Sequence, residues 1–243
     1  MTKVNVWFCE ILIKQPQFVC RHAAYNICRT EAEFILHKTQ CSNTNTNNET
    51  IFNAMKETAE VVEVPIVDAT PENTKDYGLF IGTDVPNAGL QIPFYKGSVQ
   101  EGFNLPFVCS GNAVIRTARI SKRDPEVLWL ERHMNMTQLF IGLGDQPFAM
   151  VLGKPTHAYQ SKVPDVLNVK CFVFPPGHGI MIHQGTWHDF PLCVKEPVTV
   201  LTANSPEVVE ALASMASSGE MDHGDVYKIE VRKHTGKILK ALV

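Results

Sequence analysis

The sequence lacks the features that mark several large classes of protein. It has no Cys-x-x-Cys pair, and its cysteines number seven, so we expect reduced thiols rather than a disulfide framework. No apolar run approaches the roughly 20 residues of a membrane-spanning helix. The formal charge is −3 and no Lys/Arg block is present, so neither a nucleic acid nor an anionic membrane is expected as a partner.

The N-terminus also lacks a convincing targeting segment. An apolar run covers residues 4–13, but Glu10 interrupts it and no small-residue cleavage site follows. A secretory signal peptide is therefore not expected. Together with the reduced cysteines, this predicts a cytoplasmic protein.

Composition divides the chain into two parts. Residues 39–50 are an Asn/Thr-rich tract that offers almost nothing to a hydrophobic core, which is typical of a linker. We therefore predict an N-terminal extension over residues 1–55, loosely ordered, with short helices over 31–36 and 51–60 and no site of its own. Residues 56–243 are predicted to form the folded domain.

The folded domain is rich in short β-strand patterns separated by turn formers. The expected strands cover residues 61–66, 78–82, 113–120, 127–133, 138–141, 148–152, 169–174, 179–183, 189–194 and 198–203, with edge strands over 226–231 and 238–243. A short helix is expected after Thr70, and a longer one over 206–217, capped by Asn204 or Ser205. Many short strands at this spacing predict an all-β fold, a sandwich or a closed barrel. The polar motifs described next resemble those of a cupin-type double-stranded β-barrel.

Two polar motifs lie on these strands. Glu131 and His133 are two residues apart, so on a strand both project from one face while Arg132 projects from the other and forms an ion pair or covers the sheet exterior. Gln138 follows, and the second motif runs from His183 to His188. A small barrel would bring these two stretches together.

The donor atoms of these motifs suit a metal ion. Glu131, His133, Gln138 and His188 offer a carboxylate oxygen, an amide oxygen and two imidazoles. Such a set is typical of a borderline divalent ion such as nickel, zinc or manganese, with open positions for a substrate. The alternative is a metal-free polar pocket, and for each histidine by itself a hydrogen-bonded place in the core.

The same residues resemble a known family, ureidoglycolate lyase, a group of cupin-fold enzymes of allantoin degradation in purine metabolism. The resemblance rests on the stretches 130–133, 137–138, 140–141, 148 and 183–188, with Pro191-Leu192, and spans roughly residues 61–205. Family members typically run His-Arg-x-x-Trp-His-His. This chain has Gln184 in place of that Arg and Asp189 in place of the last His.

The resemblance implies a carbon–nitrogen lyase that eliminates urea from ureidoglycolate to give glyoxylate, and it implies a homodimer. In such a reaction His183 or His188 would carry the proton, because imidazole titrates near neutral pH, and Glu131 would assist. Arg116 and Arg119 are candidates for binding the substrate carboxylate. Gln138 and Trp187 would line the substrate, although Trp187 also fits a packing residue beside the pocket.

Two other functions stay open at this point. Gln184 and Asp189 allow a different metal-dependent cupin enzyme, an isomerase or a dioxygenase. A noncatalytic barrel that binds a small anion is the third possibility. In each case the expected partner is a small molecule.

Overall fold

The computed structural model describes residues 59–85, 89 and 94–243. Residues 59–243 form one compact unit. The expected extension over residues 1–55 and the helix over 31–36 lie outside the described residues, as does most of the helix expected over 51–60. Glu60 begins a strand instead. No helix in the described ranges is long and apolar enough to cross a membrane.

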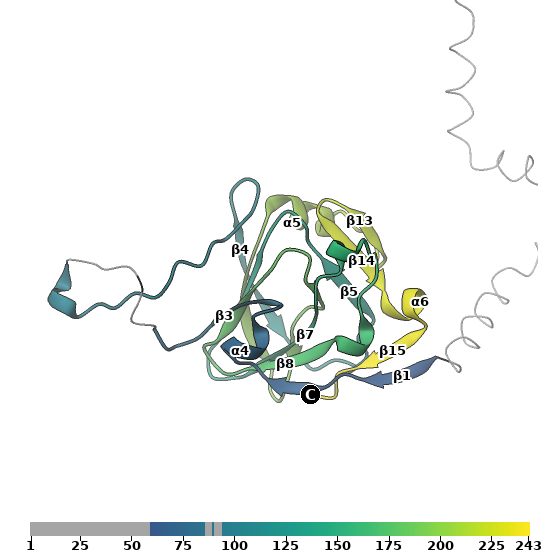
Figure 1. Ribbon diagram of the computed structural model, residues 1–243, viewed down its shortest axis with the longest axis horizontal. Helices are drawn as coiled ribbons and strands as arrows, with labels where there is room; N and C mark the ends of the chain where they lie inside the picture. Colours follow the sequence, from purple (N-terminus) through teal and green to yellow (C-terminus); the bar gives the residue numbers. More distant parts are fainter. Residues whose placement is uncertain (1–58, 86–88, 90–93) are drawn as a thin grey trace, which may run out of the picture. The chain divides into compact units, whose positions relative to one another are not determined.

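The folded unit is mostly β, as predicted, and its strands form two large sheets (Figure 1). In spatial order the larger sheet contains β13 (Met221–His223), β14 (Val226–Glu230), β5 (Trp129–Arg132), β10 (Trp187–His188), β7 (Phe148–Gly153), β8 (Lys170–Phe174) and β2 (Ile66–Asp68), with β11 (Leu192–Cys193) also paired to β7. The smaller sheet contains β3 (Gly78–Ile81), β9 (Gly179–Ile182), β6 (Gln138–Leu143), β12 (Val198–Asn204) and β4 (Val114–Ile120). A separate parallel pair joins β1 (Glu60–Glu63) to β15 (Lys237–Lys240).

The two sheets pack face to face around a shared core. Phe148, Met150 and Leu152 of β7 are fully buried, and they cluster with Phe140 of β6 and Ile180 of β9. The sheets remain separate rather than closing into a single barrel, and this double-sheet sandwich fits the predicted cupin fold. The inner face of each sheet is therefore the face that meets this core.

The outer face of the larger sheet is buried as well. Ala149 and Val151 of β7 alternate with the inner residues and belong to a second cluster, together with Leu130, Trp187 and Leu239. Strands with both faces buried read as continuous apolar runs, which is what β7 shows. Inner and outer side chains of the larger sheet can thus be told apart by the cluster that they join.

Within residues 59–85, 89 and 94–243 the helices are few and short. They are α4 (Pro71–Thr74), α5 (Pro206–Ala213) and α6 (Val231–Thr235), with 3-10 helices η1 (Tyr95–Gly97), η2 (His157–Tyr159) and η3 (Val166–Asn168). Thr70 and Asn73 form a reciprocal capping box at α4. Of the two residues predicted to cap the longer helix, Ser205 is the cap, since its side chain accepts from the backbone N–H of Val208. This helix ends at Ala213 rather than at residue 217.

Several predicted strands end earlier than expected. The run 61–66 is divided at Pro65, which has no N–H to donate: the chain before it pairs with β15 and the chain after it pairs with β8. The strand expected over 189–194 is reduced to Leu192–Cys193. The edge strand expected over 226–231 ends at Glu230, because Val231 begins α6.

Candidate functional site

Strand β5 carries the centre of the candidate site. It lies between β14 and β10, and Glu131 is in register with Lys228 on one side and with His188 on the other. Residues directly opposite in antiparallel strands project from the same face. His188 is also in register with Leu152 of the inner core. Glu131, His188 and Lys228 therefore project from the inner face of the larger sheet.

Glu131, His133 and His188 form a tight cluster, hereafter the Glu/His/His cluster. The Oε1 atom of Glu131 lies 3.6 Å from Nε2 of His188 and 3.9 Å from Nε2 of His133. One ligand atom from each residue lies within 4.8 Å of the others. The exposed fractions are 5%, 3% and 1% for Glu131, His133 and His188, so this polar group is enclosed by protein. The first motif, with Glu131 and His133, and the second motif, with His188, therefore meet in the structure.

The orientation of both imidazoles is fixed by backbone carbonyls. Nδ1 of His133 lies 2.6 Å from the carbonyl oxygen of Asp225, and Nδ1 of His188 lies 3.0 Å from that of Thr186. A carbonyl oxygen only accepts, so each Nδ1 carries the proton and donates it. In a neutral imidazole with this orientation, Nε2 carries the lone pair and directs it at the cluster, which is the arrangement found in metal-binding histidines.

Gln138 adds a fourth polar group from the smaller sheet. It lies on the same face of β6 as Phe140, whose ring packs edge-on against His188 with centroids 6.4 Å apart. Its Nε2 atom donates to Oδ1 of Asn204 at 2.6 Å. Within the described ranges, Oε1 of Gln138 and the Nε2 atoms of His133 and His188 are buried without a hydrogen-bond partner. Buried polar atoms of this kind are rare without a function or a bound species.

The electrostatics of the cluster favour an anionic Glu131 beside a neutral His133. Burial alone would raise the pKa of Glu131, but the interaction with His188, together with the charges of Lys228 and His133, outweighs burial and holds this pKa well below its usual range. Burial lowers the pKa of His133, and the neighbouring His188 lowers it further, while Glu131 opposes both. An ionised carboxylate and a neutral imidazole are the protonation states that bind metal ions.

The buried Glu/His/His cluster could therefore bind a metal ion. Its ligand atoms are one carboxylate oxygen and two imidazole nitrogens, all within 4.8 Å of one another, and the two Nε2 atoms have no hydrogen-bond partner in the part of the chain that the structure describes. Carboxylate and imidazole ligands suit borderline divalent metals. The chemistry of the donor set thus fits the predicted cofactor.

His183 does not join the cluster. Its Nε2 atom lies 3.3 Å from the carbonyl oxygen of Lys75, next to the end of α4, and the residue is partly exposed. Ile182, the last residue of β9, joins the inner core, so alternation directs the next side chain, His183, to the other face. This placement does not support the predicted role of His183 as a proton carrier.

Trp187 lies on the opposite face of β10 from His188. It is fully buried in the outer core, and its Nε1 donates to Oγ1 of Thr156 at 2.9 Å. The guanidinium of Arg132 lies over its ring, 4.6 Å from the centroid, and 5.1 Å from the ring centroid of Tyr227. The packing interpretation of Trp187 is thus favoured over a substrate contact, and Arg132 covers the outer face through cation–π contacts.

The two arginines predicted to bind the substrate carboxylate lie on opposite faces of the edge strand β4. Arg119 is in register with Thr199 and donates to its hydroxyl at 3.1 Å, on the face away from the core. It does not face the site. Arg116 is in register with the buried Thr202, on the inner face, and its side chain is exposed. Of the two, only Arg116 lies on the inner face.

Both departures from the family pattern have structural partners. Gln184 donates to the carbonyl oxygen of Met134 at 2.8 Å. Asp189 pairs with Arg123 at 2.6 Å. Burial raises the pKa of Asp189, although Arg123 opposes the shift. Gln184 and Asp189 thus connect the second motif with the segments that contain Met134 and Arg123.

Two residues near the cluster were missed by the sequence prediction. Nζ of Lys228 lies 2.8 Å from Oε2 of Glu131. The backbone carbonyl of Asp225 orients His133, and the carboxylate of Asp225 accepts from the backbone N–H groups of Met134 and Asn135. The run 226–231 did predict a strand, but nothing in the sequence indicates that this strand pairs with β5.

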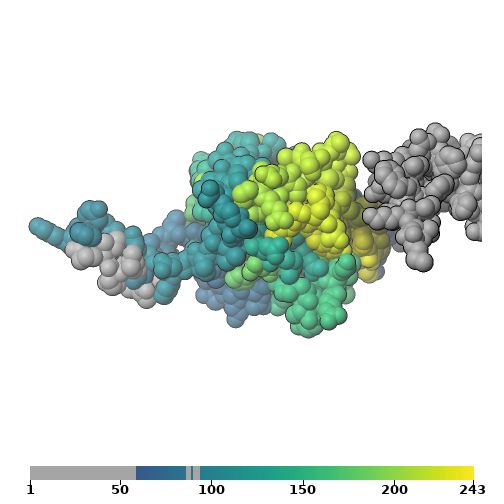
Figure 2. Space-filling view, turned by 90° about the horizontal axis from the view of Figure 1, so that it is seen from above, coloured from purple at the N-terminus to yellow at the C-terminus, as the bar shows by residue number. Residues whose placement is uncertain are grey.

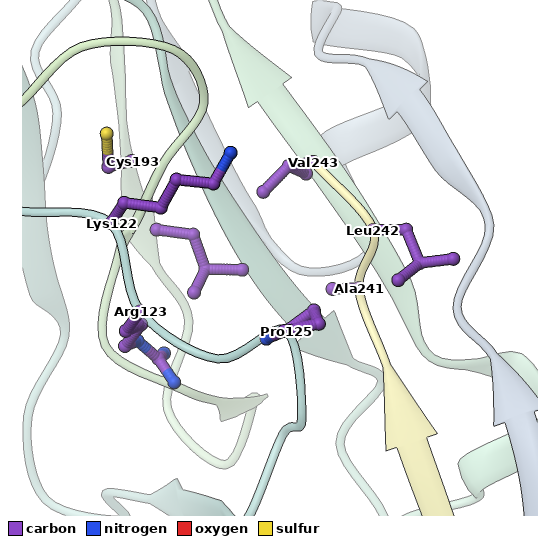
Figure 3. Close-up of a pocket in the computed structure, with 8 residues that line it drawn as sticks. Lys122, Arg123, Pro125, Cys193, Ala241, Leu242 and Val243 are labelled. Atoms are coloured by element: carbon purple, nitrogen blue, oxygen red, sulfur yellow. The ribbon is translucent and has the colours of Figure 1, made fainter.

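A surface pocket elsewhere contains none of the predicted site residues. It has a volume of about 260 Å³ and is lined by Lys122, Arg123, Pro125, Leu192, Cys193, Ala241, Leu242 and Val243. Figure 3 shows Lys122, Arg123 and Pro125 on one side and residues 241–243 on the other. We therefore place the functional site at the Glu/His/His cluster.

Comparison with known proteins supports the same region. A family model described as ureidoglycolate lyase matches residues 104–215. The matched segment runs from before β4 to just beyond α5 and contains Glu131, His133, Gln138 and His188. A search of curated proteins found no match. The resemblance inferred from the two motifs is therefore confirmed.

Proposed function

We propose that this chain, whose residues 104–215 match a family model described as ureidoglycolate lyase, eliminates urea from ureidoglycolate and releases glyoxylate. The family supports a lyase in general, and the specific substrate is our proposal. The observation that carries the proposal is the convergence of Glu131, His133 and His188 within 4.8 Å in a buried position. A cytoplasmic homodimer that takes a small-molecule substrate is part of the same proposal.

The reaction needs one proton acceptor and one proton donor. The acceptor removes the hydroxyl proton of ureidoglycolate, the carbonyl of glyoxylate forms as the carbon–nitrogen bond breaks, and the donor protonates the leaving urea nitrogen. The lone pair on Nε2 of His188 can accept the proton. The anionic Glu131, 3.6 Å away, then stabilises the imidazolium, which can return the proton to the urea nitrogen.

Glu131 itself is a weaker candidate for the base. Its lowered pKa means that the carboxylate holds a proton poorly, so its contribution is the negative charge beside the imidazole. Orientation of the imidazole comes from Thr186, whose carbonyl accepts from Nδ1. In this arrangement the imidazole is the base and the carboxylate is its charged partner. The carboxylate lies beside Nε2, the atom that accepts the proton.

A divalent ion at this site, such as nickel, zinc or manganese, would be held by Glu131, His133 and His188, with Gln138 as the additional ligand that we propose. Such an ion would polarise the substrate hydroxyl and lower its pKa. Binding an ion and accepting the proton exclude each other for His188, because both use the lone pair on Nε2. The metal content of the active enzyme decides between the two roles.

The direct test is to incubate the purified chain with ureidoglycolate and to measure glyoxylate over time. Ureidoglycolate decays spontaneously, so the buffer alone is the control. The proposal predicts release well above that background. Release at the rate of spontaneous decay would remove the lyase assignment.

A second candidate function follows from the composition of the cluster. Two histidines and one carboxylate with open positions are the ligand set of non-haem iron oxygenases, and the described residues supply this set in Glu131, His133 and His188. A dioxygenase would consume oxygen in the presence of Fe²⁺ and a small organic acid. An oxygen electrode separates the two functions, since the lyase reaction consumes none.

A further inference from the structure

We propose that Lys228 is the residue that binds the carboxylate of the substrate, an inference that rests on the proposed function. Lys228 lies on β14, in the segment after α5, beyond the residues matched by the family model. In the space-filling view this C-terminal segment, coloured yellow-green to yellow, forms a large part of the visible face (Figure 2). The segment therefore contributes a cation to the cluster that the matched residues build.

Lys228 connects the buried cluster with the solvent. Its Nζ atom lies 2.8 Å from Oε2 of Glu131, and its side chain is 24% exposed, whereas that of Glu131 is 7% exposed. An ammonium group has three N–H donors, so one contact with Glu131 leaves donors for a second anion. Lys228 is thus a cation held at the edge of the cluster by the carboxylate behind it.

A cavity lies against this lysine. Its volume is about 390 Å³, and its lining residues are Lys228, Trp129, Leu212, Met215, Ser217, Ser218, Gly219 and Met221. Trp129 precedes Glu131 by two positions on β5, so its side chain projects from the same face. The cavity thus offers one cation, two hydroxyl groups and apolar walls. These properties suit a small organic carboxylate rather than a large or strongly cationic ligand.

The order of Lys228, Glu131 and His188 across the sheet indicates how a bound substrate would be oriented. Glu131 is flanked in register by Lys228 on β14 and by His188 on β10. In an α-hydroxy acid the carboxylate and the hydroxyl are on adjacent carbon atoms. A substrate whose carboxylate is bound by Lys228 would therefore extend along this row, past Glu131, to bring its hydroxyl toward the imidazole of His188. Arg119 faces away from the core and Arg116 lies on the other sheet, so Lys228 is the better placed cation.

The test compares glyoxylate affinity, measured by titration calorimetry, for the wild-type chain and its Lys228→Met and Lys228→Arg variants. A hydrogen bond between charged groups contributes enough that its loss should weaken binding roughly 10- to 100-fold. Lys228→Arg, which keeps the charge, should retain most of the affinity. Lys154→Met is the matched control, because Lys154 also pairs with a carboxylate, Asp76 at 2.7 Å, but lies on the surface.

Removal of Lys228 leaves Glu131 without its cation, so the methionine variant could fail to fold. The pair Glu131→Gln and Glu131→Gln/Lys228→Met avoids this difficulty, because neither protein contains the buried carboxylate. A 10-fold or greater loss of glyoxylate affinity between the two supports the inference. Equal affinity, or no binding of glyoxylate by the wild-type chain, overturns it.

The lyase proposal is judged by a separate measurement. Wild-type release of glyoxylate at the spontaneous rate would remove the proposed function, whatever the calorimetry shows. With an active wild-type enzyme, Lys228→Met should raise KM for ureidoglycolate more than it lowers kcat. An active Lys228→Met enzyme with an unchanged KM would overturn the role of Lys228 while the lyase assignment stands.

Discussion

Alternation of single residues along β5 and β10 decides which side chains meet at the site. Glu131 and His188 project inward, whereas Arg132 and Trp187 project outward and stack on each other. The period of two was sufficient to predict the separation of Glu131 from Arg132. The same rule, applied to the neighbours Trp187 and His188, separates a packing residue from a candidate functional one.

A substitution at Trp187 tests this separation. Trp187→Phe removes the hydrogen bond from Nε1 to Thr156 (2.9 Å), and loss of a buried hydrogen bond typically costs about 1–3 kcal/mol. We expect urea unfolding to show a decrease of that size in the free energy of unfolding. KM for ureidoglycolate should stay unchanged, since the side chain faces the outer core. A raised KM with unaltered stability would show that Trp187 contacts the substrate after all.

At the scale of the elements, the strands themselves were easier to predict than the pairing between them. The apolar run of β7 and the Pro/Gly turns around β8 and β9 were sufficient to predict these strands. The sequence carries no signal for long-range pairing, however, so the position of β14 beside β5 could not be predicted, and Lys228 and Asp225 were missed with it. The contact of His183 with the carbonyl oxygen of Lys75 is likewise a long-range contact for which the sequence carries no signal.

Helix α5 depends on its cap. The hydroxyl of Ser205 accepts from the backbone N–H of Val208 at 3.2 Å, and Val208 is fully buried in the cluster beneath the helix. Ser205→Ala should lower the free energy of unfolding by about 1 kcal/mol. Ser205→Asp should preserve stability, because aspartate is also a good cap. Equal unfolding midpoints for the serine and alanine proteins in urea would show that this cap contributes nothing.

The ion pairs of Glu220 connect the approach to β13 with α6, and they predict a pH effect. Hydrogen bonding to Lys233, with further contributions from the backbone N–H of Glu230 and from His234, lowers the pKa of Glu220 to about 2 from 4.5, against the opposing effect of burial. A carboxyl group with a lowered folded-state pKa stabilises the fold above its unfolded-state pKa, and this contribution is lost as the pH falls toward 2.

Glu220→Gln should therefore destabilise the protein at pH 6 but have little effect near pH 2.5. Urea unfolding of both proteins at several pH values measures the difference. The effect should be small, because the pair is partly exposed and screened by solvent. A difference in the free energy of unfolding between the two proteins that grows as the pH falls would contradict this prediction.

At the scale of the whole molecule, two sheets and a C-terminal segment enclose one polar cluster. The cluster combines residues from β5, β10 and the loop after β5, and β6 and β14 add Gln138 and Lys228. Pattern and resemblance were sufficient to predict the mostly-β fold and the meeting of Glu131 with His133 and His188. They could not predict the carbonyl partners of the imidazoles. That of His133 comes from Asp225, far along the chain, and that of His188 comes from Thr186 and depends on the local backbone conformation.

Metal binding should stabilise the whole domain. A ligand that binds only the folded state at 100 times its Kd adds about 2.7 kcal/mol. We expect zinc, nickel or manganese to raise the thermal midpoint of chelator-treated protein, and we expect this shift to vanish in a His133→Ala/His188→Ala variant. The same shift in both proteins would place the binding elsewhere, and no shift in either would favour the metal-free site.

The most direct test of the site is the rate of glyoxylate release by His188→Ala and by a control, His178→Ala. His188 is buried in the Glu/His/His cluster, whereas His178 lies in a turn after β8, where its Nδ1 contacts the carbonyl oxygen of Pro176. Loss of a positioned acid or base typically lowers turnover about 10²- to 10⁴-fold. We predict a loss in that range for His188→Ala with retained folding, and full activity for His178→Ala. Full activity of His188→Ala would contradict the assignment of catalysis to this cluster.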